Sequence, residues 1–182
     1  MNLIYKVEDA DIGEEKMEMD NPKVRYASRG IVLNAKNEIA LFYKEKMNEY
    51  KLPGGGIEEN EKAIDAFKRE VLEETGCIID NINELGIIEE YKSHANFKQR
   101  SYVFVGNVKE DTNKLYITDK EKAEGAKLMW KSPENALKLI KECYDNLLDS
   151  PYDKDENVYS TKFIAIRDQK ILEYFMKEWY QK

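Results

Sequence analysis

The chain has 182 residues, of which 42% are hydrophobic and 36% are charged. This length favours a single domain, residues 1–182, with one sizeable core. The formal net charge of -7 argues against a duplex nucleic acid partner, which would require a basic surface. It does not exclude a small phosphorylated substrate, because bound divalent cations can invert the local field.

Targeting and redox signals point to the cytoplasm. The first 16 residues lack the basic region and the apolar run of a signal peptide. No apolar stretch approaches the ~20 residues that are needed to span a bilayer. Cys77 and Cys143 form no CxxC or metal-binding pattern, so we expect two reduced thiols in a cytoplasmic protein.

Strand patterns dominate the first third of the chain. Residues 1–23 are polar and acidic apart from residues 3–5, and they predict a short strand followed by a mobile N-terminal extension. The next strands are predicted at 24–33, 38–44 and 50–52, the first two forming a hairpin. The glycine run at 53–56 predicts a loop, because Pro fixes φ and glycine permits unusual backbone geometry.

A helix is predicted after the glycine run. Asn60 suits the N-cap, and Gly76 suits the residue that ends the helix. An apolar stripe along it comprises Ile64, Phe67 and Val71.

Three acids lie together near the end of this helix. Glu70, Glu73 and Glu74 project to one side, where like charges repel and the helix dipole disfavours anions. A bound cation would relieve this repulsion. Carboxylate oxygens without His or Cys suit a hard ion such as Mg²⁺ or Mn²⁺. The alternative interpretation is a solvated acidic face.

The second half of the chain predicts further strands around 85–88, 101–108 and 126–130, with a polar loop at 92–99 and a charged connection at 109–124. Ser132 and Pro133 suit the start of a helix that reaches about Tyr144. The last helix, 161–179, carries a stripe of Ile164, Ile171, Phe175 and Trp179. A mixed sheet with helices on its faces, an α/β fold, accounts for these elements.

The segment Gly55–Cys77 resembles the MutT-like box of the Nudix hydrolases, G-x5-E-x7-R-E-U-x-E-E-x-G-U, where U is a bulky aliphatic residue. The matching residues are Gly55, Glu61, Arg69, Glu70, Val71, Glu73, Glu74, Gly76 and Cys77. Seven identities at fixed spacing arise by chance at on the order of one in 10⁸ per start position. Cys77 departs from the usual Ile, Leu or Val, but cysteine is also a small buried hydrophobe. The resemblance covers about 24–144 and implies an α/β/α sandwich, to which 145–182 adds a loop and a C-terminal helix.

The resemblance also implies a catalytic site. Metal ligands would be Glu70, Glu73 and Glu74 with the carbonyl oxygen of Gly55. A further carboxylate would come from the loop before the last strand, with Glu124 preferred.

At this predicted site two roles stay open and two are indirect. Glu121 is the alternative to Glu124 as the loop carboxylate, and Glu70 or the loop acid would be the general base. Arg69 is expected to hold Glu73 at i+4, and Glu61 to anchor the loop to the helix.

Substrate contacts are predicted on the strands. Arg29 or Arg100 could hold a phosphate bidentately, although such residues are often surface charges. Tyr102, like Tyr26 and Phe97, could stack on a base, although strand aromatics are often core. The single histidine, His94, is expected to be a loop residue without a role as general base.

These features predict a Mg²⁺-dependent hydrolase, with Mn²⁺ as a possible substitute, of a nucleoside diphosphate linked to another moiety. Family markers for ADP-ribose and dinucleoside polyphosphate substrates are absent at 92–95, which leaves nucleoside triphosphates, including oxidised ones, by elimination. ADP-ribose or another nucleotide sugar is the alternative substrate. A Nudix-fold binding or regulatory module without hydrolysis is the alternative function. We expect no membrane partner and either a monomer or a homodimer.

Overall fold

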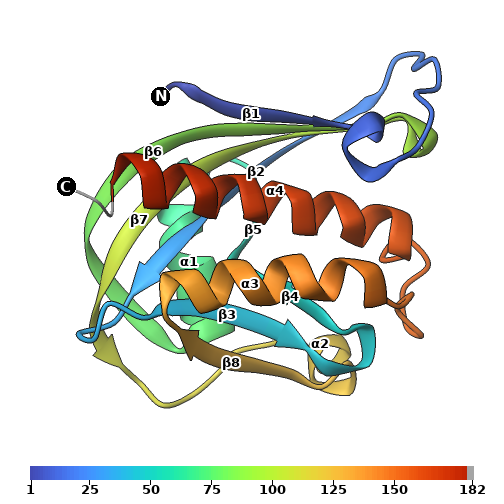
Figure 1. The fold of residues 1–182 in the computed structure, drawn as a ribbon. Coiled ribbons are helices and arrows are strands. Elements are labelled where there is room, and N and C mark those ends of the chain that lie inside the picture. The colour runs from blue at the N-terminus through green and yellow to red at the C-terminus, as the bar shows by residue number, and fades with distance from the viewer. Residues whose placement is uncertain (180–182) are drawn as a thin grey trace.

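The computed structural model describes residues 1–179 as a mixed sheet between two helical layers (Figure 1). The strands are β1 (Leu3–Glu8), β2 (Lys23–Leu33), β3 (Ile39–Lys44), β4 (Glu49–Lys51), β5 (Gly54–Gly56), β6 (Cys77–Lys92), β7 (Phe97–Asp111) and β8 (Ala126–Lys131). The α-helices are α1 (Ala63–Thr75), α2 (Asp119–Ala123), α3 (Pro133–Cys143) and α4 (Val158–Glu178). Short 3-10 helices lie at Asp9–Ile12, Glu45–Met47, Ser93–Ala95 and Tyr144–Asn146. The predicted α/β/α sandwich with an added C-terminal helix is confirmed.

Within residues 1–179 the sheet has eight strands in the order β1-β6-β7-β2-β3-β4, with β5 paired to β2 and β8 paired to β3. β2 runs parallel to β7, and β1 runs parallel to β6. The predicted hairpin of β2 and β3 keeps only the pair Leu33 and Ile39 beside its turn. Beyond that pair β3 leaves β2 and runs between β4 and β8. At the other edge of the sheet, β1 of the N-terminal extension pairs with β6, so this part of the extension belongs to the sheet.

The glycine run is a strand, which corrects the predicted loop. Gly54–Gly56 form β5, antiparallel to residues 27–29 of β2. Gly54 has φ of 146°, and a Cβ there would collide with the backbone of Ser28 and Arg29. Only glycine tolerates both the left-handed backbone and this close approach. The chain is thus fixed to the sheet immediately before the acidic helix.

The core has two parts because successive side chains of β2 point to opposite faces of the sheet. Ile31 belongs to the larger cluster, which α3 and α4 cover. Val32 belongs to the smaller cluster, which contains Phe67 and Val71 of α1. Phe67 stacks on Phe104 of β7 with ring centroids 5.5 Å apart. The predicted apolar stripe of the box helix therefore packs against the sheet.

Helices α3 and α4 cover the other face (Figure 1). Ser132 caps α3 by accepting a hydrogen bond from Asn135 N at 3.3 Å, as predicted. Ile171 and Phe175 of α4 are fully buried, whereas Ile164 is half-buried and Trp179 is exposed.

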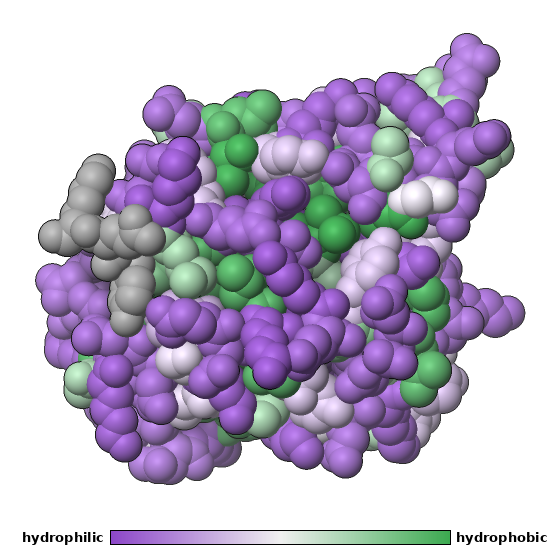
Figure 2. All heavy atoms as spheres, viewed as in Figure 1, coloured by the Kyte–Doolittle hydropathy of each residue, from purple (hydrophilic) through white to green (hydrophobic). Residues whose placement is uncertain are grey.

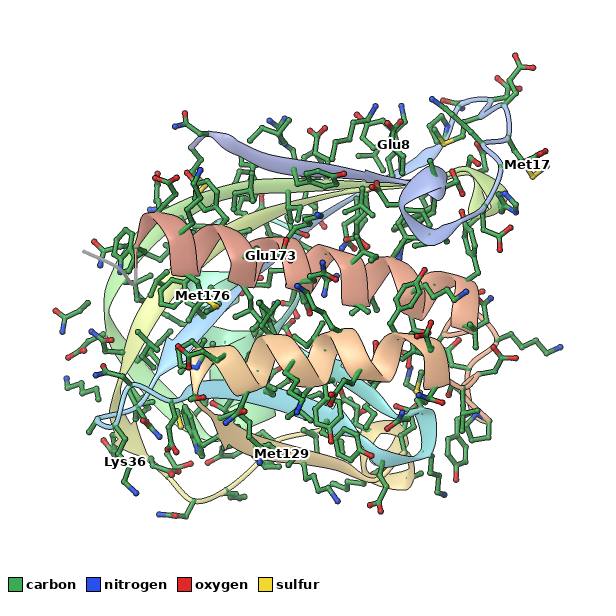
Figure 3. The ribbon with its side chains drawn as sticks, viewed as in Figure 1. Glu8, Met17, Lys36, Met129, Glu173 and Met176 are labelled. Atoms are coloured by element: carbon green, nitrogen blue, oxygen red, sulfur yellow. The ribbon has the colours of Figure 1, made fainter. Side chains whose placement is uncertain are left out.

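The outer surface of these two helices is polar. Glu173 and Met176 mark α4 in Figure 3, and Glu173 pairs with Lys141 of α3 at 2.8 Å. Figure 2 shows mostly hydrophilic atoms over this outer surface. The apolar core beneath therefore holds these helices against the sheet, while the ion pair links them at the surface.

Several predicted boundaries differ from the structure, and the strand expected around 85–88 is the much longer β6. Asn60 is not the N-cap: it has φ of 62° in a turn, and Lys62 precedes the first helical residue. The loop predicted at 92–99 is shorter, because β6 reaches Lys92 and β7 begins at Phe97. The connection at 109–124 contains α2. Among residues 1–179, no helix is long and apolar enough to cross a membrane.

Candidate active site

Glu74 is the buried acid of the box. Its Oε1 accepts a hydrogen bond from Lys51 Nζ at 2.8 Å, and its Oε2 accepts one from Gly54 N at 2.8 Å. Burial raises the pKa of the Glu74 carboxyl, and Lys51 and the Gly54 N–H partly offset that effect. One oxygen of Glu74 is thus fixed by a residue of β4 and the other by a residue of β5.

Glu70 lies directly against β5. A Cβ at Gly55 would collide with the carboxylate of Glu70, so this position admits no side chain. Arg69 donates from Nη1 to Glu70 Oε1 at 2.8 Å. The Glu70 carboxylate therefore lies against the backbone of Gly55, and Arg69 holds one of its oxygens.

Arg69 is held mainly by Glu61, and its predicted pairing with Glu73 is present as a longer contact. Its Nε and Nη2 donate to the two Glu61 oxygens at 2.9 Å each, whereas the contact with Glu73 is 3.5 Å. Nη2 also donates to Gly56 O at 2.9 Å. The hydrogen bonds from Arg69 lower the pKa of Glu61. Arg69 thereby ties the turn before α1 to both β5 and the helix, as expected for the anchor role of Glu61.

Glu73 is the most accessible box acid, with its side chain 41% exposed. Burial raises the pKa of Glu73, Arg69 opposes this effect, and the charges of Glu74 and Glu121 add to it. Tyr116 N donates to Glu73 O at 2.8 Å, which brings the segment before α2 over the end of α1. The charge of Glu121 thus reaches Glu73, while Glu121 Oε2 accepts hydrogen bonds from Thr118 N and Oγ1 at 2.8 Å each at the start of α2.

The chemistry of these donors suits a hard divalent cation. Glu70, Glu73 and Glu74 with the carbonyl of Gly55 offer oxygen ligands alone, which is the chemistry that Mg²⁺ and Mn²⁺ prefer. In the part of the chain that the structure describes, no three acidic, histidine or cysteine side chains converge ready to hold a metal. Glu74 turns to Lys51 and Glu70 turns to Arg69, so a metal would compete with these cations for the carboxylates.

Glu124 lies just before β8, where the sequence placed it, but its carboxylate belongs to a buried ionic cluster. It is fully buried, pairs with Lys44 Nζ at 2.9 Å, and accepts a hydrogen bond from Ser150 Oγ at 2.7 Å. Lys44 also pairs with Glu156 at 2.6 Å. This placement argues against a metal-ligating role for Glu124, because its carboxylate is enclosed in a buried ionic cluster. Of the two loop acids, Glu121 is the one whose charge acts on Glu73.

Arg29 is not available to a substrate, which corrects the prediction. Its side chain is 4% exposed on the face covered by α4, and its Nε donates to Ser101 Oγ at 3.1 Å. Arg100 is exposed and lies 3.6 Å from Glu89. His94 stacks on Tyr159 of α4 with centroids 5.1 Å apart, which agrees with the prediction of a loop histidine.

A cavity of about 510 Å³ adjoins the turn before α1. Its wall includes Arg25, Tyr26, Ile57, Glu61 and Tyr102. Tyr102 is the residue predicted to stack on a base, whereas Arg25 was not among the predicted substrate contacts. Strand alternation places Arg25 and Arg29 on one face and cannot separate them. The difference arises because α4 covers mid-strand Arg29, while Arg25 near the strand start stays exposed.

Comparisons with known proteins place this geometry in a family. The putative 8-oxo-dGTP diphosphatase of Bacillus subtilis is 31% identical over 103 residues, which are 57% of this chain and 63% of that protein. The 8-oxo-dGTP diphosphatase of Buchnera aphidicola is 36% identical over 73 residues, which are 40% of this chain and 48% of that protein. The chain thus spans less than two thirds of the length of each relative.

Solved structures share the fold. The MutT protein of Bacillus halodurans superposes with a TM-score of 0.51 at 24% identity, over 63% of this chain and 72% of that one. The MutT NUDIX hydrolase of Burkholderia pseudomallei does so with a TM-score of 0.51 at 16% identity, over 62% of this chain and 85% of that one. The NUDIX domain model matches residues 23–150, which include the whole box. The chain therefore belongs to the Nudix family.

Proposed function

We propose that the protein is a divalent-metal-dependent pyrophosphohydrolase of a nucleoside diphosphate linked to another moiety, most specifically an oxidised nucleoside triphosphate. The observation that carries this proposal is the placement of the Glu70 carboxylate directly against Gly55 of β5, beside the fixed carboxylate of Glu74. Two relatives with 8-oxo-dGTP diphosphatase activity in their names support the choice of substrate.

Some residues of the box would bind the metal, and others keep the metal ligands in position. Glu70, Glu73, Glu74 and the carbonyl of Gly55 would bind Mg²⁺ or Mn²⁺. When bound, the cation neutralises phosphate charge and lowers the pKa of a bound water. The salt bridge of Arg69 with Glu61 keeps the glycine strand and the acidic helix in register.

Hydrolysis adds water across a phosphoanhydride and releases a nucleoside monophosphate and pyrophosphate. Glu70 is our first choice for the group that accepts the proton of the attacking water, because it is one of the acids that would hold the cation, and that cation would lower the pKa of this water. Glu121 is our choice for the loop carboxylate, because its charge acts on Glu73 whereas Glu124 is enclosed with Lys44.

The cavity beside Glu61 is the proposed nucleotide site. Its volume of about 510 Å³ lies within the usual range for small-molecule sites. Tyr26 and Tyr102 present aromatic surface for a base, and Arg25 presents a guanidinium for a phosphate. The substrate would enter between the start of β2 and the turn before α1. The free, buried thiols of Cys77 and Cys143 support the proposed location in the reducing cytoplasm.

A substrate panel tests this proposal. The protein is incubated with oxidised and normal nucleoside triphosphates, nucleotide sugars including ADP-ribose, and dinucleotides, with Mg²⁺, Mn²⁺ or EDTA. The expected result is metal-dependent release of pyrophosphate, fastest from an oxidised nucleoside triphosphate. Preference for a nucleotide sugar would correct the substrate. Nucleotide binding without hydrolysis of any member would overturn the enzymatic function in favour of a binding module.

A further inference from the structure

We propose that Asp168 of α4 is a positioning residue for Glu74 and acts through the backbone of Leu52. This inference rests on the proposed function, because it concerns the acid that would hold the metal. Asp168 lies outside residues 23–150, which match the family model. The C-terminal helix would therefore support the metal site from the opposite face of the sheet.

A buried hydrogen bond joins α4 to the segment between β4 and β5. Leu52 N donates to Asp168 Oδ2 at 2.8 Å, and both residues are fully buried. A charged acceptor makes this bond stronger than one between neutral groups. Leu52 follows β4 directly, so α4 holds the chain where it leaves the sheet edge for the glycine strand.

Leu52 lies in the chain between the two residues that donate hydrogen bonds to Glu74. Lys51 precedes it and donates to Glu74 Oε1, while Gly54 follows it and donates to Glu74 Oε2. Pro53 O accepts a hydrogen bond from Gly30 N at 3.1 Å, which fixes the same segment to β2. A shift of the Leu52 peptide would therefore move both groups that orient the Glu74 carboxylate.

Arg167 holds both carboxylate oxygens of Asp168 in place. Arg167 donates from Nε to Asp168 Oδ1 at 2.7 Å and from Nη2 to Oδ2 at 3.1 Å. Arg167 also reaches Glu90 Oε2 at 3.3 Å from Nη1. Buried ion pairs often stabilise a fold no better than apolar residues of similar size. Their presence on an otherwise apolar face of α4 is explained if the carboxylate is needed at Leu52.

The test measures Mn²⁺ binding directly, by calorimetry without substrate, together with kcat and KM. Asp168→Ala should weaken Mn²⁺ binding roughly 10- to 100-fold, as is typical when a supporting group behind a metal ligand is lost. The kcat should fall more than KM rises. Asp168→Asn keeps an oxygen acceptor for Leu52 N and should recover most of the affinity.

Two further variants separate positioning from stability. Arg167→Met/Asp168→Leu replaces the ion pair with apolar side chains, so it should fold and yet bind Mn²⁺ as weakly as Asp168→Ala. Ile171→Ala opens a cavity in the same helix and should lower Tm without changing Mn²⁺ affinity.

The outcomes distinguish this inference from the proposed function. Wild-type Mn²⁺ affinity in the double variant would overturn the inference, as would an equal loss of affinity in Ile171→Ala, while the proposed function would stand. Absence of Mn²⁺ binding and of hydrolysis in the unsubstituted protein would overturn both.

Discussion

Arg69 and Glu61 form a bidentate salt bridge, with Nε and Nη2 each 2.9 Å from a carboxylate oxygen. Glu61 Oε2 also accepts a hydrogen bond from Glu58 N at 2.9 Å. The pair therefore fixes the turn before α1 to the middle of that helix. Arg69 has one remaining nitrogen, Nη1, which contacts Glu70. Glu61 in this way determines where Arg69 lies relative to the proposed metal ligands.

Removal of Glu61 is predicted to impair catalysis more than folding. In Glu61→Ala, Arg69 loses both hydrogen bonds to Glu61 and can turn further towards Glu70 and Glu73, where its charge would compete with a metal. We expect turnover to fall roughly 10- to 100-fold. Steady-state kinetics and thermal unfolding measure the two effects. Glu59→Ala, an exposed neighbour, is the control and should match wild type; equal activity of Glu61→Ala and Glu59→Ala would refute this role.

Adjacent glycines of β5 are predicted to give different kinetic defects. Gly55→Ala would drive a Cβ into the Glu70 carboxylate, so kcat and Mn²⁺ affinity should both fall by at least about tenfold. Gly56→Ala would place a Cβ 2.8 Å from the Arg25 guanidinium, which can swing away. That variant should raise KM with a smaller change in kcat. Indistinguishable kinetics in the two variants would contradict this division between metal site and nucleotide cavity.

The two loop acids are predicted to differ between stability and catalysis. Glu124→Ala leaves buried Lys44 with Glu156 as its remaining ionic partner and should cost about 3 kcal/mol of unfolding free energy. Glu121→Gln should leave Tm nearly unchanged and lower turnover on the order of 100-fold. Denaturant unfolding and initial rates distinguish them. A stable, inactive Glu124→Gln protein beside a fully active Glu121→Gln would return the catalytic role to Glu124.

Acid stability depends on the buried cluster under α4. Burial alone would raise the pKa of Glu90, but Lys92 and Arg167 outweigh it and lower the pKa to about 2. The unfolded chain therefore takes up a proton near the ordinary pKa of 4.5 while the folded chain does not. The resulting stabilisation, about 3 kcal/mol, is present above pH 4.5 and is lost as pH falls towards 2.

Urea unfolding at pH 5 and pH 3 checks this dependence on Glu90. Wild type should lose more stability across the interval than Glu90→Gln, which cannot take up that proton. The matched control is Glu18→Gln, since Glu18 is exposed and should leave the difference at its wild-type value. A loss in Glu90→Gln equal to that of wild type would contradict the assignment.

Local pattern was enough to predict the box helix and the layers of the fold. The spacing of Phe67 and Val71 sets the face of α1 that packs on the sheet, and Gly76 ends that helix with φ of 70°. These are short-range effects of helical period and backbone freedom. The glycine run could not be assigned in this way, because Gly55 becomes a strand only by pairing with Ser28, 27 residues earlier.

The local sequence pattern did not predict ion pairs and charge contacts between residues that are far apart in the sequence. Arg29 was predicted for phosphate because alternation gives a side chain a face but does not say which helix covers that face. The structure buries it beside Glu90 and Arg167, which come from β6 and α4. Likewise, nothing near Glu124 in the sequence indicates its ion pair with Lys44, 80 residues away. Long-range packing decides these contacts.

The most direct test compares wild type with Glu74→Gln on 8-oxo-dGTP, with Mg²⁺ or with EDTA, by following the release of monophosphate and pyrophosphate. Glutamine preserves an acceptor for Lys51 or Gly54 but removes the charge that would hold the cation. Asp65→Asn, on an exposed position of the same helix, is the control. We predict Mg²⁺-dependent hydrolysis by wild type and Asp65→Asn, and a loss of at least about 100-fold in folded Glu74→Gln. Wild-type rates in Glu74→Gln, or hydrolysis undiminished by EDTA, would contradict it.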